Sequence, residues 1–124
     1  MPIPSDYTDI VQKLSISTDQ GKVKWAAAAF GYEVAILKSR LRIYSGTDDN
    51  DLAFVSVLLT DEKGNNLDSW YVDIGESDYD VMHRLVAAAK RYANGVPERL
   101  SAIKAAMENL DIIGDDISGD DIPF

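Results

Sequence analysis

The last residues of the chain bring together an aromatic ring, a terminal carboxylate and two acidic side chains. The chain closes with Asp120, Asp121, Ile122, Pro123 and Phe124. A peptide of this kind can insert its ring into an apolar pocket while its carboxylates contact basic side chains. Because a short peptide buries little area when it becomes ordered, the expected affinity is micromolar and decreases with salt. The alternative is an acidic segment that only keeps the chain in solution, but such a segment does not require an apolar end.

This end resembles the C-terminal tip of bacterial single-stranded-DNA-binding proteins. The resemblance covers the last five residues strictly, or about ten residues when the preceding acids are counted. It implies a docking peptide for replication, recombination and repair enzymes. The ring of Phe124 would enter an apolar pocket and its α-carboxylate would meet a basic residue. Pro123 would restrict the backbone, and Ile122 would fill a second apolar site. Asp120 and Asp121 would face a basic rim.

The body of the chain, residues 1–107, does not resemble that family in sequence. It loosely resembles small uncharacterised prokaryotic domains in which a β-meander is followed by an alanine-rich helix, and this resemblance implies no activity. The leading interpretation is a non-enzymatic interaction protein whose tip docks on enzymes that bind the tails of single-stranded-DNA-binding proteins. Docking would either recruit those enzymes or compete for them, and competition would suit a phage or mobile-element protein.

A second group of side chains suits contact with a single nucleic-acid strand. The basic and aromatic side chains of this group are Lys22, Lys24, Lys38, Arg40, Arg42 and Tyr44. Phe30 is close to them in the chain and is expected to point to the same side. Basic side chains pair with phosphates and aromatic rings stack on bases, as single-strand binding without sequence preference requires. The group predicts an alternative function, a divergent single-stranded-DNA-binding protein. The competing interpretation is the solvated face of a half-buried sheet, which is a common arrangement.

Charge is distributed unevenly along the chain. The net charge is −9, from 12 basic and 21 acidic residues. Residues 108–124 hold six of the acids and no base, which leaves 12 bases and 15 acids, a net charge of −3, in residues 1–107. An acidic chain binds the phosphate backbone poorly, but this objection applies mainly to the tail. A further alternative is an inhibitor that mimics DNA, which would need its acids on a rigid surface rather than in a tail.

The composition excludes several kinds of site. The chain has no Cys, so a disulfide, a thiol nucleophile and a cysteine metal site are excluded. With His83 as its only histidine, it cannot form a site on two histidines. The acids of 48–51 lack the alternating ligands, central glycine and distal glutamate of a calcium loop. We therefore expect no metal, no cofactor and no catalytic residue. No segment reads as a secretory signal or a membrane span, so a cytoplasmic location is expected.

Apolar residues at helical spacing predict three helices. The first covers residues 5–16 with Ser5 as its N-cap, and the second begins at Ser77 and stops at Asn94-Gly95. The third follows Pro97, which suits the first turn of a helix. A narrow apolar seam with spacings of four and three residues runs along it: Val96, Leu100, Ile103, Met107 and Leu110. This seam either packs inward or pairs with a second copy, which would give a homodimer.

Alternating apolar and polar residues predict strands between the first two helices. The expected strands are 22–27, a hairpin over 34–43 that turns near Lys38-Ser39, 52–60 and 67–74, with Trp25, Trp70 and Tyr71 in the core or at its edge. Short turns make successive strands antiparallel. The chain is therefore expected to form one α+β domain over residues 1–110, with an antiparallel meander of four to five strands, a short N-terminal helix and two C-terminal helices. Residues 111–124 are expected to form a disordered acidic tail.

Overall fold

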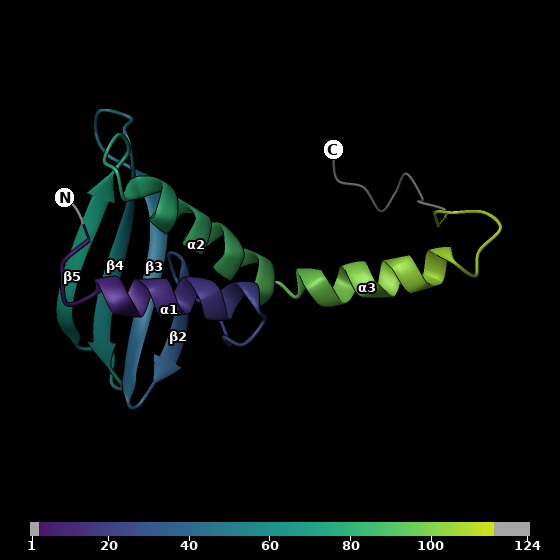
Figure 1. Cartoon of the computed structure of the whole chain (residues 1–124), viewed down its shortest axis with the longest axis horizontal. Helices are drawn as coiled ribbons and strands as arrows, with labels where there is room; N and C mark the ends of the chain where they lie inside the picture. The colour runs from purple at the N-terminus through teal and green to yellow at the C-terminus, as the bar shows by residue number, and fades with distance from the viewer. Residues whose placement is uncertain (1–2, 116–124) are drawn as a thin grey trace.

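Two helices cover one face of a five-stranded antiparallel sheet in the computed structural model, which describes residues 3–115 (Figure 1). The elements are α1 (Thr8–Asp19), β1 (Ala26–Ala27), β2 (Tyr32–Ile36), β3 (Ser39–Thr47), β4 (Ala53–Asp61), β5 (Asn66–Asp73), α2 (Tyr79–Ala93) and α3 (Val96–Met107). The strand order in the sheet is the order in the chain, so each strand pairs with the next one. The predicted α+β meander, with one N-terminal and two C-terminal helices, is confirmed.

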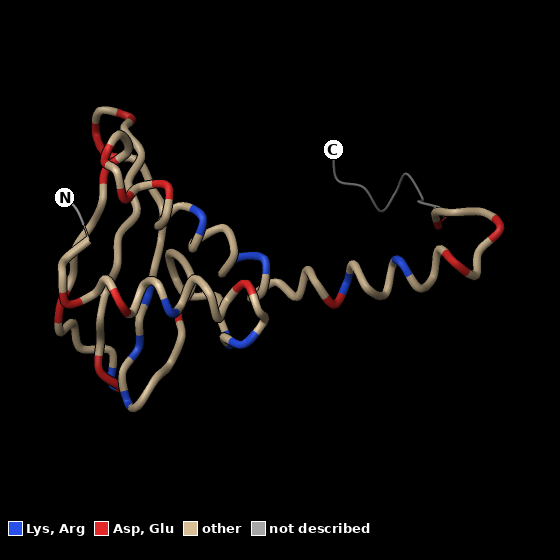
Figure 2. The backbone as a smooth tube through the Cα atoms, viewed as in Figure 1, with Lys and Arg blue, Asp and Glu red and all other residues tan. Residues whose placement is uncertain are grey.

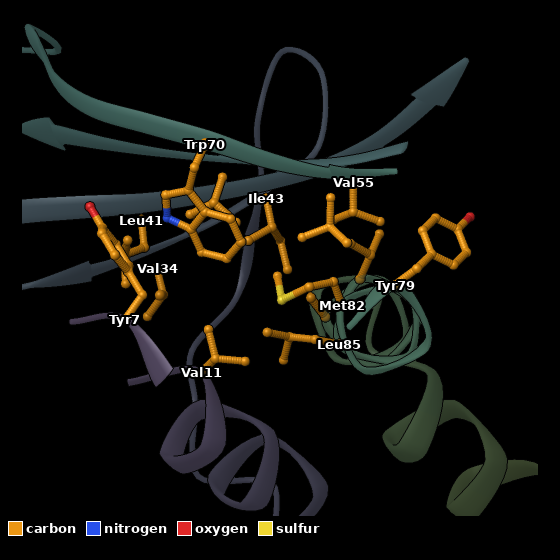
Figure 3. Packing of buried hydrophobic residues seen from close by; sticks show 14 of the residues in the cluster. Tyr7, Val11, Val34, Leu41, Ile43, Val55, Trp70, Tyr79, Met82 and Leu85 are labelled. Atoms are coloured by element: carbon orange, nitrogen blue, oxygen red, sulfur yellow. The ribbon is translucent and has the colours of Figure 1, made fainter. Parts of the chain in front are cut away.

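The hydrophobic core lies between the sheet and helices α1 and α2 (Figure 3). Alternate side chains of a strand point to opposite faces, and one row from each of β2 to β5 points toward the helices. The least exposed members of this cluster are Ile43, Val55, Val57, Val72, Met82, Leu85 and Ala89. Trp25 and Trp70 are both buried, as the sequence predicted.

Helix α1 begins and ends three residues later than predicted. The N–H of Tyr7 donates to the carbonyl of Pro4 at 2.9 Å, so the chain turns once more before the helix and Ser5 is not its N-cap. At the other end, Thr18 faces the interior and keeps the last turn helical. The indole Nε1 of Trp25 donates to Oγ1 of Thr18 at 2.9 Å, and both side chains are buried.

The predicted strand over residues 22–27 is wrong for its first four residues. Only Ala26–Ala27 pairs with β2. The N–H of Lys22 donates to the carbonyl of Ser17, so this residue belongs to the turn that follows α1. The side chain of Trp25 then turns into the core, because its indole N–H finds its acceptor on α1.

Helix α2 packs against α1 and against every strand of the sheet. The helix begins at Tyr79, two residues after the predicted start at Ser77. Asp78 occupies its N-cap position, and the Asp78 side chain does not cap the helix. The Asp78 carboxylate instead accepts the N–H of Ile3 at 2.9 Å, which ties the N-terminal segment to the start of α2. The helix ends at Ala93, immediately before the predicted stop at Asn94-Gly95.

Helix α3 leaves the body of the protein (Figure 1). Gly95 has φ 67°, a left-handed conformation that glycine adopts readily, and it separates α3 from α2. Within residues 3–115, α3 contacts no element except α2, and none of its residues is buried. The apolar seam of α3 therefore does not pack inward, which removes one of the two predicted alternatives.

Tyr7 joins the N-terminal segment to β5. Its ring packs edge-on against Trp70, with ring centroids 5.3 Å apart, and its hydroxyl donates to the Asp68 carboxylate at 2.8 Å. Burial of the hydroxyl, which is the largest cause, and the hydrogen bond to Asp68 raise the pKa of Tyr7 from 10.0 to about 12. The folded protein thus holds this proton more tightly than the unfolded chain does.

We predict that deprotonation of Tyr7 lowers the stability of the protein at alkaline pH. The stability that protonated Tyr7 contributes is fully present below pH 10.0 and is lost as the pH rises toward 12. Urea unfolding at several pH values measures this loss, and in Tyr7→Phe the decline over the same pH range should be smaller. At neutral pH the Tyr7→Phe protein should be about 1 kcal/mol less stable, because the hydrogen bond is missing. An equal alkaline decline in both proteins would contradict the assignment.

We also predict that the hydroxyl of Thr18 is required at the end of α1. Thr18→Val keeps the shape of the side chain but leaves the buried indole N–H of Trp25 without its acceptor, which should cost about 1–3 kcal/mol of unfolding free energy. Thr18→Ser is the matched control, because it keeps the hydroxyl and loses only a methyl group. Thermal or denaturant unfolding measures both, and a Val variant as stable as the wild type would show that the hydrogen bond does not matter.

Candidate binding surface on the open face of the sheet

The sheet face opposite α1 and α2 is not covered by any element of residues 3–115 (Figure 1). The strand register lines up its side chains in rows across β3, β4 and β5. Tyr44, Ser56 and Tyr71 form one row. The name open face is used here for the aromatic, apolar and basic side chains that gather on this side: Phe30, Arg42, Tyr44, Phe54, Leu58 and Tyr71.

Two glycines allow close packing near the open face, one on β3 against an aromatic ring and one before β2 against the backbone of β3. Phe54 packs edge-on against Tyr44, with ring centroids 6.0 Å apart. A Cβ atom on Gly46 would lie 3.1 Å from the ring of Phe54, so the missing side chain leaves space for that ring. A Cβ atom on Gly31 would lie 2.1 Å from the carbonyl oxygen of Ile43. Because glycine allows this close approach, the turn between β1 and β2 lies directly against β3.

Two adjoining hollows lie on the open face. One, of about 500 Å³, is lined by Phe30, Arg42, Tyr44 and Leu58 among others. The second, of about 350 Å³, includes Tyr44 again and extends toward β5. Phe30 is 78% exposed and Tyr71 is 47% exposed, so neither ring is used for core packing. Tyr71 was expected in the core or at its edge, and this prediction is wrong because its position on β5 points to the uncovered side.

Arg42 adds a polar group with unused hydrogen-bonding capacity. Its Nη2 lies 3.3 Å from Glu33 on β2, and Arg40 lies 3.7 Å from the same carboxylate. Its Nε is buried and has no acceptor among the residues that the structure describes. Because Nε itself is enclosed, a ligand from solvent does not reach it. The Arg42 side chain as a whole is 28% exposed, so a ligand can meet its positive charge at the surface.

The structure brings together only part of the predicted basic group. Arg40, Arg42 and Tyr44 alternate along β3 and point to the same side. Lys38 lies in the turn between β2 and β3, where it has φ 62°, and thus sits at the end of the hairpin rather than on its face. Lys22 and Lys24 precede β1 and lie outside the paired strands. Figure 2 shows the described Lys and Arg residues spread over several elements rather than collected in one stripe.

The predicted docking residues Asp120, Asp121, Ile122, Pro123 and Phe124 lie outside the described residues. The same holds for most of the tail that was expected to be disordered. Residues 111–115, which precede the tip and are described, are all exposed.

The remaining candidates for chemistry have structural roles. The Asp48 carboxylate accepts the N–H groups of Asn50 and Leu52 at 2.8 and 3.0 Å, so it shapes the turn between β3 and β4. His83 is exposed on α2 and stacks on Tyr79, with ring centroids 5.5 Å apart. In the described range, three or more His, Asp or Glu side chains nowhere converge on a possible metal position. No helix of that range has the length and apolar character to cross a bilayer.

Sequence reasoning missed Phe54 and Leu58 as members of the open face. The residues of β4 are apolar on both sides of the strand, so alternation could not separate the side that packs on the helices from the side that does not. The one available signal was Gly46, because a glycine in a strand often marks close approach by another group.

No protein-family model, curated protein or solved structure matches the chain. A function for it therefore rests on its own residues and their arrangement.

Proposed function

We propose that the chain is a non-enzymatic interaction protein whose C-terminal tip docks on replication, recombination or repair enzymes that bind the tails of single-stranded-DNA-binding proteins. The tip consists of Asp120 to Phe124. Its support in the sequence is the order of acidic, apolar and aromatic residues at the end of the chain, which resembles the tip of that family.

The observation that carries the proposal is the position of α3. This helix has 12 residues and a rise of 1.5 Å per residue, so it carries the chain about 18 Å beyond the end of α2. Residues 108–115, which follow it, are all exposed. The body of the protein therefore does not bury residues 108–115, the described part of the segment that leads to the tip, and a docking peptide needs such an exposed lead-in.

Docking uses two properties of the last residue at once. The ring of Phe124 supplies a large apolar group, and a free α-carboxylate on the same residue supplies a fixed negative charge. Asp120 and Asp121 add negative charges that attract a basic rim and make the binding sensitive to salt. The chain then either recruits the enzyme or competes with other tips for its pocket.

We predict micromolar binding of the full chain to an exonuclease that recognises the tip of single-stranded-DNA-binding protein, measured by calorimetric titration. Phe124→Ala should weaken the binding about tenfold or more, because a buried aromatic ring contributes about 1.5–3 kcal/mol. Removal of Ile122-Pro123-Phe124 should abolish it.

The matched control is a chain extended by one glycine after Phe124. It keeps the charge and every side chain but moves the carboxylate away from the ring, so it should bind more weakly than the wild type. Binding should also decrease as salt is added. The proposal fails if the full chain and the chain without the last three residues bind equally.

A second candidate function, binding of a single nucleic-acid strand, is supported by the open face. Tyr44, Tyr71 and Phe30 offer rings for base stacking, and the partly exposed side chain of Arg42 offers a positive charge for a phosphate. Glu33 and Asp73 on the same side balance Arg40 and Arg42 in charge. Any such binding is therefore expected to be weak and to require low salt.

Fluorescence anisotropy with labelled oligo-dT at low salt tests this candidate, using the full chain and a chain that ends at residue 107. Phe30→Ala and Tyr71→Ala should each weaken binding by about 1–3 kcal/mol if a base stacks on the ring. Ile16→Ala is the control, because Ile16 is an exposed apolar residue on α1, on the other side of the sheet. No binding by either chain would dismiss the candidate.

A further inference from the structure

We propose that α3 pairs antiparallel with α3 of a second copy of this chain. The seam residues that lie on this helix, Val96, Leu100, Ile103 and Met107, are then buried between two copies, whereas Leu110 lies beyond the end of the helix at Met107. This inference goes beyond the proposed function and does not depend on it.

The seam is the part of α3 that lacks a partner. On this helix Leu100, Ile103 and Met107 are each between 45% and 54% exposed. Within the described chain, α3 contacts only α2. A helix of about 12 residues is marginally stable in water unless its apolar face is packed against something. Another surface that covers this seam would therefore stabilise the helix.

The spacing of the seam fits a second helix better than a groove or a sheet. On α3 its residues follow one another at intervals of four, three and four. This is the repeat with which two helices pack side by side through alternating knobs and holes. A stripe only two residues wide is too narrow to fill a broad groove. An identical seam on a second copy has the matching width, repeat and length.

The charges beside the seam favour the antiparallel arrangement. In a parallel pair, Arg99 of one copy would face Lys104 of the other, because the two positions flank the seam five residues apart. In an antiparallel pair with Leu100 opposite Ile103, Arg99 lies near Ala106 and Lys104 lies near Pro97. This register removes the repulsion between like charges and keeps all contacts across the seam apolar.

The shape of the protein also permits this arrangement. The α/β body lies at one end of α3, and the rest of the helix projects away from it (Figure 1). An antiparallel pair places the two bodies at opposite ends of the paired helices, so that they do not compete for the same space. The contact involves four seam side chains from each copy, which is small for a stable interface, so the dimer should be weak and concentration-dependent.

Sedimentation equilibrium of the full chain tests the pairing. We expect the average mass to rise from 13.6 kDa toward twice that value as the protein is concentrated into the high-micromolar range. Ile103→Glu should keep the protein monomeric over the same range, because it places two carboxylates in the seam. Ala105→Glu is the matched control, since Ala105 lies on the opposite side of α3, and it should dimerise as the wild type does.

A thermal unfolding curve of each variant shows whether the body remains folded. No residue of α3 is buried, so the unfolding midpoint of the body should be the same in the wild type and both variants at low concentration. Removing Ile122-Pro123-Phe124 should not change the dimerisation. A failure of the tip to dock and a failure of α3 to pair are therefore distinguishable.

The orientation is tested by a spin label on Asn109→Cys, since the chain has no native cysteine. Antiparallel pairing separates the two labelled backbones by about 15 residues, or about 22 Å along the helix axis. Parallel pairing brings them to roughly 10 Å, and that result would overturn the antiparallel register. Two results would overturn the proposal. One is a wild type that stays monomeric at every concentration, which is expected if its own residues 111–124 cover the seam. The other is dimerisation that persists in Ile103→Glu.

Discussion

The packing of α2 across one face of the sheet is the contact on which the rest of the structure depends. Met82 and Ala89 of this helix are fully enclosed, and the helix touches all five strands. A two-layer domain of this size has one core, and α1 and α2 together fill it. The other face of the sheet and the last helix lie outside this core, because residues 3–115 contain no further apolar layer that could cover them.

The protein consequently presents two apolar surfaces with different chemistry. The open face offers rings, a glycine-shaped hollow and the guanidinium of Arg42, which suits a planar or anionic ligand. The seam of α3 offers only aliphatic and thioether side chains in a line, which suits another helix. These surfaces lie on different elements, so occupation of one does not require occupation of the other. If α3 pairs as proposed, each assembly carries two tips, and a partner with two pockets would bind it with added avidity.

Particular elements show where local reasoning from sequence works. The alternation of Leu41 and Ile43 with Arg40 and Arg42 correctly placed one side of β3 in the core and the other in solvent. It failed for residues 22–25, where the same alternation occurs without a partner strand, since a strand exists only where a neighbour supplies hydrogen bonds. The expected starts at Ser5 and Ser77 were wrong because a turn precedes each helix, closed by the N–H of Tyr7 on the carbonyl of Pro4 and by the N–H of Tyr79 on the carbonyl of Glu76.

The sequence by itself determined the order of the elements, their periodicity and the chemistry of the last five residues, because these depend on side chains that are near one another along the chain. Only the tertiary structure decided that Tyr71 and Phe54 face away from the core, that Arg42 has an unpaired Nε, and that the apolar seam of α3 stays outside. Each of these depends on which face of the sheet the helices cover. That choice is made by packing between residues far apart in the chain, such as Trp70 with Tyr7, and between elements far apart in the chain, such as α2 with β4. No local pattern contains it.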